Sequence, residues 1–167
     1  MILNRIKQFY LSLFSGMKDE DFDFIDIYLD EFEKNIFLKL KRDEQKHSIR
    51  VARLVMNISK EKDEYNKVNL DRVIRAGLLH DVGKSDKRIN IVQKVFMVLA
   101  NKRFGERLRK INRFEFVDCY YNHPDMSYNM LKDHIKDNKL LFLIKNHHSK
   151  IRGARELDLL IYCDDKN

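Results

Sequence analysis

Apolar residues recur along this chain with the period of an α-helix. Between residues 47 and 58, Val51, Leu54, Val55 and Ile58 fall on one helical face, and residues 70–81 and 154–164 repeat the pattern. Such a period places one stripe of each helix against a core. The pattern predicts helices over residues 3–14, 20–39, 43–60, 69–81, 87–103, 107–121, 125–137, 139–148 and 154–165.

Turn-forming residues are scarce. The 167 residues include one proline and five glycines, too few for the many turns of an all-β protein. We expect Pro124 at the first position of a helix, with His123 at the cap before it. A chain of this length can bury one core. The prediction is an all-α, single-domain helical bundle over residues 1–167, with N-terminal helices in 1–40 and core helices in 43–165.

Composition excludes several classes of protein. No apolar run approaches the length of a membrane span, so we expect no membrane partner. The first residues, MILNRIKQFYLSLFSG, are unlike a signal peptide because Gln8 and Ser12 interrupt the apolar run and no small-residue cleavage site follows. Cys119 and Cys163 form neither a disulfide framework nor a metal-binding spacing. These features favour a cytoplasmic protein.

Charge is distributed unevenly along the chain. Lys and Arg number 33 against 26 Asp and Glu, which leaves a net charge of +7. Residues 18–33 are mostly acidic, whereas residues 84–113 are rich in bases. A basic stretch favours an anionic partner such as a phosphate ester, a nucleotide or, less favoured here, a nucleic acid. A solvated helix surface explains the charge alone more simply, and the sequence does not indicate the oligomeric state.

Ionisable residues continue the apolar stripes at the helix ends. Each stands one helical turn from the nearest apolar residue of its stripe: His47, Asp81, His147 and Asp164, with His80 beside Asp81. An unpaired charge buried in a core opposes folding by several kcal/mol. A metal ion removes that conflict because it accepts imidazole nitrogens and carboxylate oxygens as ligands together.

A single histidine on an apolar stripe is more often a hydrogen-bonded core residue than a ligand. His134, in the middle of a predicted helix and outside any motif, is interpreted in that way. The other five of the six histidines lie at predicted helix ends or junctions, two of them adjacent and one beside an aspartate. A core stabilised by ordinary hydrogen bonds does not need this clustering.

The stretch AGLLHDVGK resembles the motif of the HD-domain metal-dependent phosphohydrolases, in the branch that reads His-Asp-(Ile/Val)-Gly-Lys. The resemblance extends from DEQKHSIRVARLV to LLIYCDDKN. The family's first histidine, His-Asp pair and last aspartate correspond to His47, His80, Asp81 and Asp164. Members that hold two metals add a histidine before a proline and a His-His pair, which correspond to His123, His147 and His148.

This resemblance implies two divalent ions bridged by Asp81, which polarise a phosphoryl oxygen and activate a water molecule. His47, His80 and Asp164 would complete one ion, and His123, His147 and His148 would hold the other. Nitrogen and oxygen donors without thiolate suit Fe, Mn, Zn, Co or Ni better than Mg or Ca. Asp165 is an alternative to Asp164 as the last ligand.

Lys84 follows Asp81 by three residues, past Gly83. The family motif implies that its ammonium binds the substrate phosphate or the developing charge. A surface lysine after the end of a helix is the simpler alternative.

Two functions follow from this pattern. The first is an enzyme that hydrolyses a nucleotide or another phosphate ester through a metal-activated water, with Asp81 and Lys84 as catalytic residues. The alternative is a non-catalytic, metal-containing regulatory module that binds a nucleotide or nucleic acid. A complete ligand set together with Lys84 favours the enzyme. Cyclic-di-GMP is not the expected substrate, because HHSKIRGARELD lacks the Glu and the Gly-Tyr-Pro loop of those phosphodiesterases.

Overall fold

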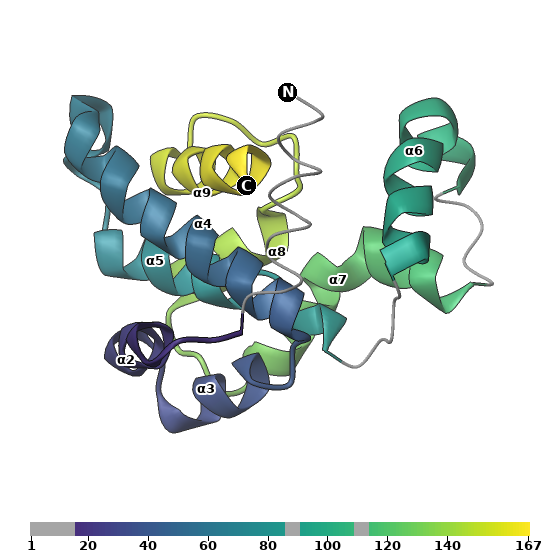
Figure 1. The fold of residues 1–167 in the computed structure, drawn as a ribbon. Coiled ribbons are helices and arrows are strands. Elements are labelled where there is room, and N and C mark those ends of the chain that lie inside the picture. The colour runs from purple at the N-terminus through teal and green to yellow at the C-terminus, as the bar shows by residue number, and fades with distance from the viewer. Residues whose placement is uncertain (1–15, 86–90, 109–113) are drawn as a thin grey trace.

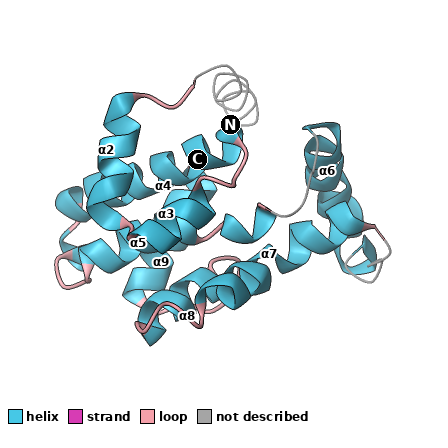
Figure 2. Ribbon diagram, turned by 90° about the horizontal axis from the view of Figure 1, so that it is seen from below, coloured by secondary structure: helices cyan, strands magenta, loops and turns pink. Residues whose placement is uncertain are grey.

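The computed structural model describes residues 16–85, 91–108 and 114–167. Regular structure in these ranges is entirely helical (Figure 2), which confirms the all-α prediction. The elements are α2 (Asp19–Tyr28), α3 (Glu31–Phe37), α4 (Arg42–Glu61), η1 (Asp63–Tyr65), α5 (Leu70–Leu79), η2 (Val82–Lys84), α6 (Ile91–Leu108), α7 (Glu115–Leu131), α8 (Asn138–Asn146) and α9 (Arg155–Lys166). The predicted helix over residues 3–14 lies outside the described residues.

Helix α5 is the centre of the fold. It packs against α4, α8 and α9 and also contacts α2 and α3, and its Val73, Ile74 and Leu78 are completely buried. Helices α6 and α7 extend from this core to one side (Figure 1), where α6 packs against α7. The ionisable end of α5 therefore faces inward, towards helices distant in sequence.

The predicted helix over residues 20–39 is wrong in one respect, because the structure divides it into α2 and α3. Asp30 begins α3: its side chain accepts a hydrogen bond from the Glu33 N–H (2.9 Å), and the Glu33 side chain accepts one from the Asp30 N–H (3.2 Å). This reciprocal capping box satisfies N–H groups that a helix start leaves without partners. The apolar period continued across the break and concealed it.

The prediction that Pro124 begins a helix is also wrong, because the single helix α7 runs through it. Proline has no N–H, so the carbonyl of Tyr120, four residues earlier, loses its helical hydrogen bond. Nδ1 of His123 lies 3.1 Å from that carbonyl oxygen and takes the vacant place. The side chain before the proline thus compensates for it, and α7 continues to Leu131.

Helix α7 ends six residues before the predicted limit of 137. His134 follows it in a turn and is not the buried core residue that its position predicted. Its Nε2 lies 2.8 Å from Asp30 Oδ2 at the surface, and its ring stacks on Phe32 with centroids 4.1 Å apart. His134 therefore joins α7 to α3, away from the other histidines.

The acidic segment contributes two buried carboxylates that attach α2 and α3 to the core. Asp21 is 1% exposed and binds Lys46 of α4 (Nζ–Oδ2, 2.7 Å). Glu33 is completely buried and receives the guanidinium of Arg75 in α5, with contacts of 2.6–3.1 Å. Buried carboxylates need such partners because desolvation alone would oppose their ionisation.

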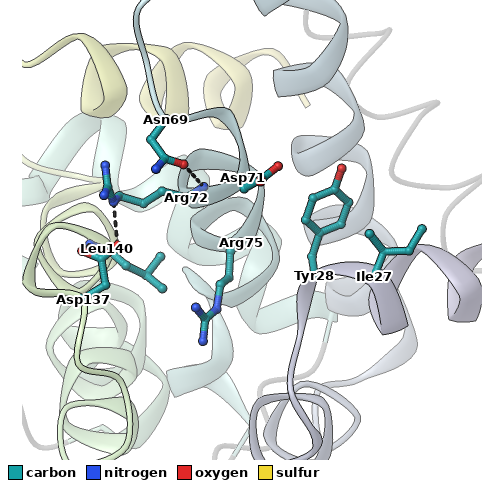
Figure 3. A pocket seen from close by; sticks show the side chains of 8 residues that line it. All are labelled: Ile27, Tyr28, Asn69, Asp71, Arg72, Arg75, Asp137 and Leu140. Atoms are coloured by element: carbon teal, nitrogen blue, oxygen red, sulfur yellow. Dashed lines mark hydrogen bonds and ion pairs between the residues drawn. The ribbon is translucent and has the colours of Figure 1, made fainter.

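A pocket of about 410 Å³ lies near the N-terminal end of α5 (Figure 3). Arg72 and Arg75 line it, and Arg72 binds Asp137 (Nε–Oδ2, 2.7 Å) and Glu156 (Nη1–Oε1, 3.0 Å). Because these guanidinium groups are neutralised by carboxylates of the protein, we interpret this pocket as a place where ion pairs hold neighbouring helices together.

Within the described ranges, no helix is both long and apolar enough to cross a lipid bilayer. Cys119 and Cys163 are buried free thiols.

Gly83 allows η2 to lie directly against α7. A Cβ atom at this position would lie 2.5 Å from the His123 carbonyl oxygen and 2.6 Å from the Ser127 nitrogen. The Gly83 N–H donates to Ser127 Oγ (2.8 Å), and that hydroxyl donates to the His80 carbonyl (2.7 Å). One serine side chain therefore fixes η2 and the end of α5 against α7.

Substitution Gly83→Ala is expected to lower the free energy of unfolding by roughly 1–3 kcal/mol, as overpacking does. The obstructing atoms belong to the backbone of α7 and cannot rotate away. Denaturant unfolding followed by circular dichroism measures the change. Gly16→Ala is the control, because a Cβ there meets nothing within 4 Å. Equal midpoints for Gly83→Ala and the parent would contradict the close approach.

Candidate metal centre

Side chains from five parts of the chain converge at the end of α5. His47 comes from α4, His80 and Asp81 follow α5, His123 comes from α7, His147 and His148 follow α8, and Asp164 comes from α9. Three overlapping groups each bring three donor atoms within 4.8 Å of one another: His47, His80 and Asp164; His80, Asp81 and His147; and His123, His147 and His148. The structure thus brings together every residue that the sequence predicted as a ligand.

Asp81 lies between the two outer groups and is 1% exposed. Its Oδ1 lies 3.2 Å from His123 Nε2 and 3.8 Å from His147 Nε2. Its Oδ2 lies 3.4 Å from His80 Nε2 and 3.8 Å from His47 Nε2. Each carboxylate oxygen therefore faces a different set of imidazoles, which is the arrangement that a bridging ligand needs.

The last aspartate faces the first of these sets. Asp164 Oδ1 lies 3.0 Å from His47 Nε2 and 3.6 Å from His80 Nε2. Asp165 lies at the surface. Of the two aspartates that the sequence left open, Asp164 is the one that contacts the cluster.

Backbone carbonyls orient three of the imidazoles. Nδ1 of His80 lies 2.9 Å from Gly77 O, Nδ1 of His147 lies 2.6 Å from Ile144 O, and Nδ1 of His123 lies 3.0 Å from Cys119 O. A carbonyl only accepts hydrogen bonds, so Nδ1 carries the proton and Nε2 is directed into the cluster. Metal-binding histidines are commonly fixed in this way.

The contacts between these groups fit a cation. Nε2 of His123 and Nε2 of His147 lie 3.2 Å apart, so two lone pairs face each other when both rings are neutral. His80 Nε2 and Asp81 Oδ1 are buried and have no hydrogen-bond partner. Buried polar atoms without partners are rare and unfavourable. A divalent ion that takes nitrogen and oxygen ligands would satisfy all of them.

The charges of the cluster are strongly coupled. Burial lowers the pKa of His80, but the charges of Asp81 and Asp164 outweigh it and raise that pKa to about 10. Burial raises the pKa of Asp81, but His80 and Lys84 hold it well below its usual range. His80 is therefore protonated at neutral pH when no other cation neutralises the two carboxylates.

The pKa values of His147 and His148 shift in the opposite direction. Burial, together with the positive charge of neighbouring imidazoles, lowers the pKa of His147, and the same causes lower that of His148 to about 4. Both rings are therefore neutral at physiological pH. Neutral imidazole is the form that binds metals.

Lys84 lies at the cluster and pairs with Asp81. Its Nζ is 2.6 Å from Asp81 Oδ2 and 3.8 Å from Glu44 Oε2. Its side chain is 24% exposed and also lines a pocket of about 540 Å³. The ammonium thus borders both the carboxylate and the space beside it.

That pocket includes residues that the sequence did not single out. Its walls come from η2, α6, α7 and the end of α8, and it is lined by Lys84, Asn101, Tyr120, Tyr121, His123, Pro124, Asp125, Lys145, His148 and Ser149. Its volume lies within the range of about 300–1,000 Å³ that is usual for small-molecule sites. The side chains outside the motif do not share a stripe or spacing that would have identified them.

Comparison with known proteins adds one finding to this geometry. Neither the curated proteins nor the solved structures include a match to the chain. The family model of the HD domain matches residues 45–165. This match covers most of the chain and contains every member of the His–Asp cluster. The chain therefore belongs to the HD domain family.

Proposed function

We propose that this protein is a metal-dependent phosphohydrolase whose substrate is a nucleotide or another phosphate ester. HD domains are generally enzymes of this class. The observation that carries the proposal is the buried Asp81 carboxylate, whose two oxygens face different imidazole groups beside a pocket lined by Lys84.

The donor atoms support two ions on opposite sides of Asp81. His47, His80 and Asp164 would hold one, and His123, His147 and His148 would hold the other. Imidazole and carboxylate donors suit Fe, Mn, Zn, Co or Ni. When bound, such ions polarise a phosphoryl oxygen and lower the pKa of a water molecule towards neutrality.

Side chains and backbone carbonyls of the protein bind the substrate and orient the ligands. Lys84 stands between Asp81 and the pocket, so its ammonium binds a phosphoryl oxygen and neutralises the charge that develops there. The carbonyls of Gly77, Cys119 and Ile144 keep three imidazoles in one orientation. The buried position of Asp81 limits water around the carboxylate and strengthens these interactions.

Asp164 and Asp165 form a matched pair for testing the metal site. Asp164→Asn should lower the affinity for a divalent metal by at least tenfold, because its oxygen no longer carries the charge that faces His47 and His80. Asp165→Asn should bind metal like the parent. Titration of chelator-stripped protein with Mn²⁺ or Zn²⁺, with circular dichroism to verify folding, measures both. Equal affinities for the two variants would rule out Asp164 as a ligand.

Metal binding should depend on pH through His80. Its pKa of about 10 in the folded protein exceeds the ordinary value of 6.5, so between these limits a metal must displace a proton. Affinity should therefore rise with pH from 7 to 9, by up to about tenfold per unit. In protein from which a chelator has removed the metal, the charged His80 stabilises the fold fully below pH 6.5. That contribution to the free energy of unfolding is lost as the pH rises through about 10. Affinity that is flat over this range would contradict the assignment.

Lys84→Ala should retain metal and lose turnover. Removal of one group that stabilises transition-state charge lowers kcat by roughly 10²–10³-fold, measured here with p-nitrophenyl phosphate and metal-loaded protein. Lys60→Ala, at an exposed position in the last turn of α4, is the control. A metal-loaded parent that binds nucleotides but hydrolyses no phosphate ester would instead favour the regulatory module.

A further inference from the structure

The pocket beside the cluster has a wall that no motif explains. Its lining includes His123, His148 and Lys84, the residues closest to the proposed chemistry. The same lining includes Asn101 of α6 with Tyr120 and Tyr121 of α7. A substrate whose phosphate reaches the cluster must place its remaining atoms against these other residues.

Asn101 lines the pocket together with both tyrosines. Tyr121 donates its hydroxyl proton to Asn101 Oδ1 (2.7 Å), and the same hydroxyl lies 3.2 Å from the Gly105 carbonyl oxygen. That contact uses the Asn101 oxygen as an acceptor, so its amide NH₂ is the group left to donate to the hydroxyl of Tyr120, which lines the same pocket. The contact between Asn101 and Tyr121 links α6 to the part of α7 that carries His123.

Tyr120 has a hydroxyl proton to donate. If its oxygen accepts from the Asn101 amide, that proton is left for a ligand in the pocket. The ring is half-buried, and the charge of Lys84 acts on its hydroxyl. Burial raises the pKa of Tyr120, so the hydroxyl stays neutral. A neutral donor therefore lines the same pocket as the Lys84 ammonium.

We propose that Tyr120, oriented by Asn101, donates a hydrogen bond to the ester oxygen of a phosphate ester bound in this pocket. This inference rests on the proposed function. It makes Tyr120 a substrate-binding residue, Asn101 and Tyr121 positioning residues, and α6 a wall of the substrate site. Because the ester oxygen gains negative charge as the bond to phosphorus breaks, this hydrogen bond strengthens in the transition state.

The substrate class follows from the lining of the pocket. Two phenol rings, an amide and the ammonium of Lys145 surround the space outside the cluster. A cyclic alcohol component with polar substituents, or an aryl group, fits this mixture of ring faces and hydrogen-bonding groups. Phosphate esters of such alcohols should be preferred to inorganic pyrophosphate.

The test compares two esters of the same shape and different leaving-group basicity. Phenyl phosphate releases a more basic oxygen than p-nitrophenyl phosphate, so it needs the hydrogen bond more. In Tyr120→Phe, kcat for phenyl phosphate should fall roughly tenfold more than kcat for p-nitrophenyl phosphate. KM should change little for either ester, and metal content should equal that of the parent. Tyr28→Phe, in α2 at the remote pocket, is the control.

Two further variants test the positioning residues. Asn101→Ala removes the amide that is proposed to orient Tyr120. Gly105→Ala places a Cβ atom 2.8 Å from Asn101 Oδ1 and should displace that amide. Both should reproduce the selective loss on phenyl phosphate to a smaller degree, because the Tyr120 hydroxyl remains but is no longer oriented.

The outcomes separate this inference from the proposed function. An active parent whose Tyr120→Phe variant loses the same factor on both esters would overturn the hydrogen bond to the ester oxygen and leave the enzyme assignment intact. A parent that hydrolyses neither ester with Fe, Mn, Zn, Co or Ni would overturn both. Selective loss on phenyl phosphate, with metal and fold unchanged, supports the inference.

Discussion

The burial of the Asp81 carboxylate is the constraint on which the rest of this structure depends. A carboxylate that is 1% exposed requires positive charge close by, which Lys84 provides, and imidazoles from α4, α7 and the end of α8 surround it. These helices are distant in sequence, so satisfying one side chain fixes the positions of several elements. In the metal-free protein a proton on His80 provides part of this charge, and divalent ions would provide it more completely.

Two local irregularities of the backbone lie close to the side chains that surround Asp81. Helix α5 ends at Leu79 and is followed by the short η2, whose Gly83 lies against the backbone of α7. Pro124 leaves the Tyr120 carbonyl without its helical partner, and His123 Nδ1 binds it. Both features lie beside imidazoles whose Nε2 atoms face Asp81. These two departures from ideal helix geometry therefore occur where the donor atoms need fixed directions.

Helix α6 extends the site beyond the shared core. It packs on the outer part of α7 (Figure 1), and its Asn101 and Gly105 contact Tyr121 there. The cluster sets the type of chemistry, because its donors are those that bind divalent metals. The pocket between α6, α7 and α8 instead selects the molecule on which that chemistry acts, since its walls surround everything beyond the phosphate.

Periodicity and residue type were sufficient to predict the helical class and the convergence of His47, His80, Asp81, His147 and Asp164. His123 and His148 were predicted as ligands only from the resemblance to the HD-domain motif. Apolar stripes require a shared core, and ionisable residues that continue them must meet inside it. The break at Asp30, the uninterrupted helix through Pro124 and the choice of Asp164 over Asp165 depended on hydrogen bonds and on the direction of each side chain. The same holds for Asn101, Tyr120 and Tyr121, which come together only when α6 packs on α7. Local pattern therefore determined which helix faces form the core, whereas tertiary structure decided which atoms face one another, because that depends on contacts between segments far apart in the chain.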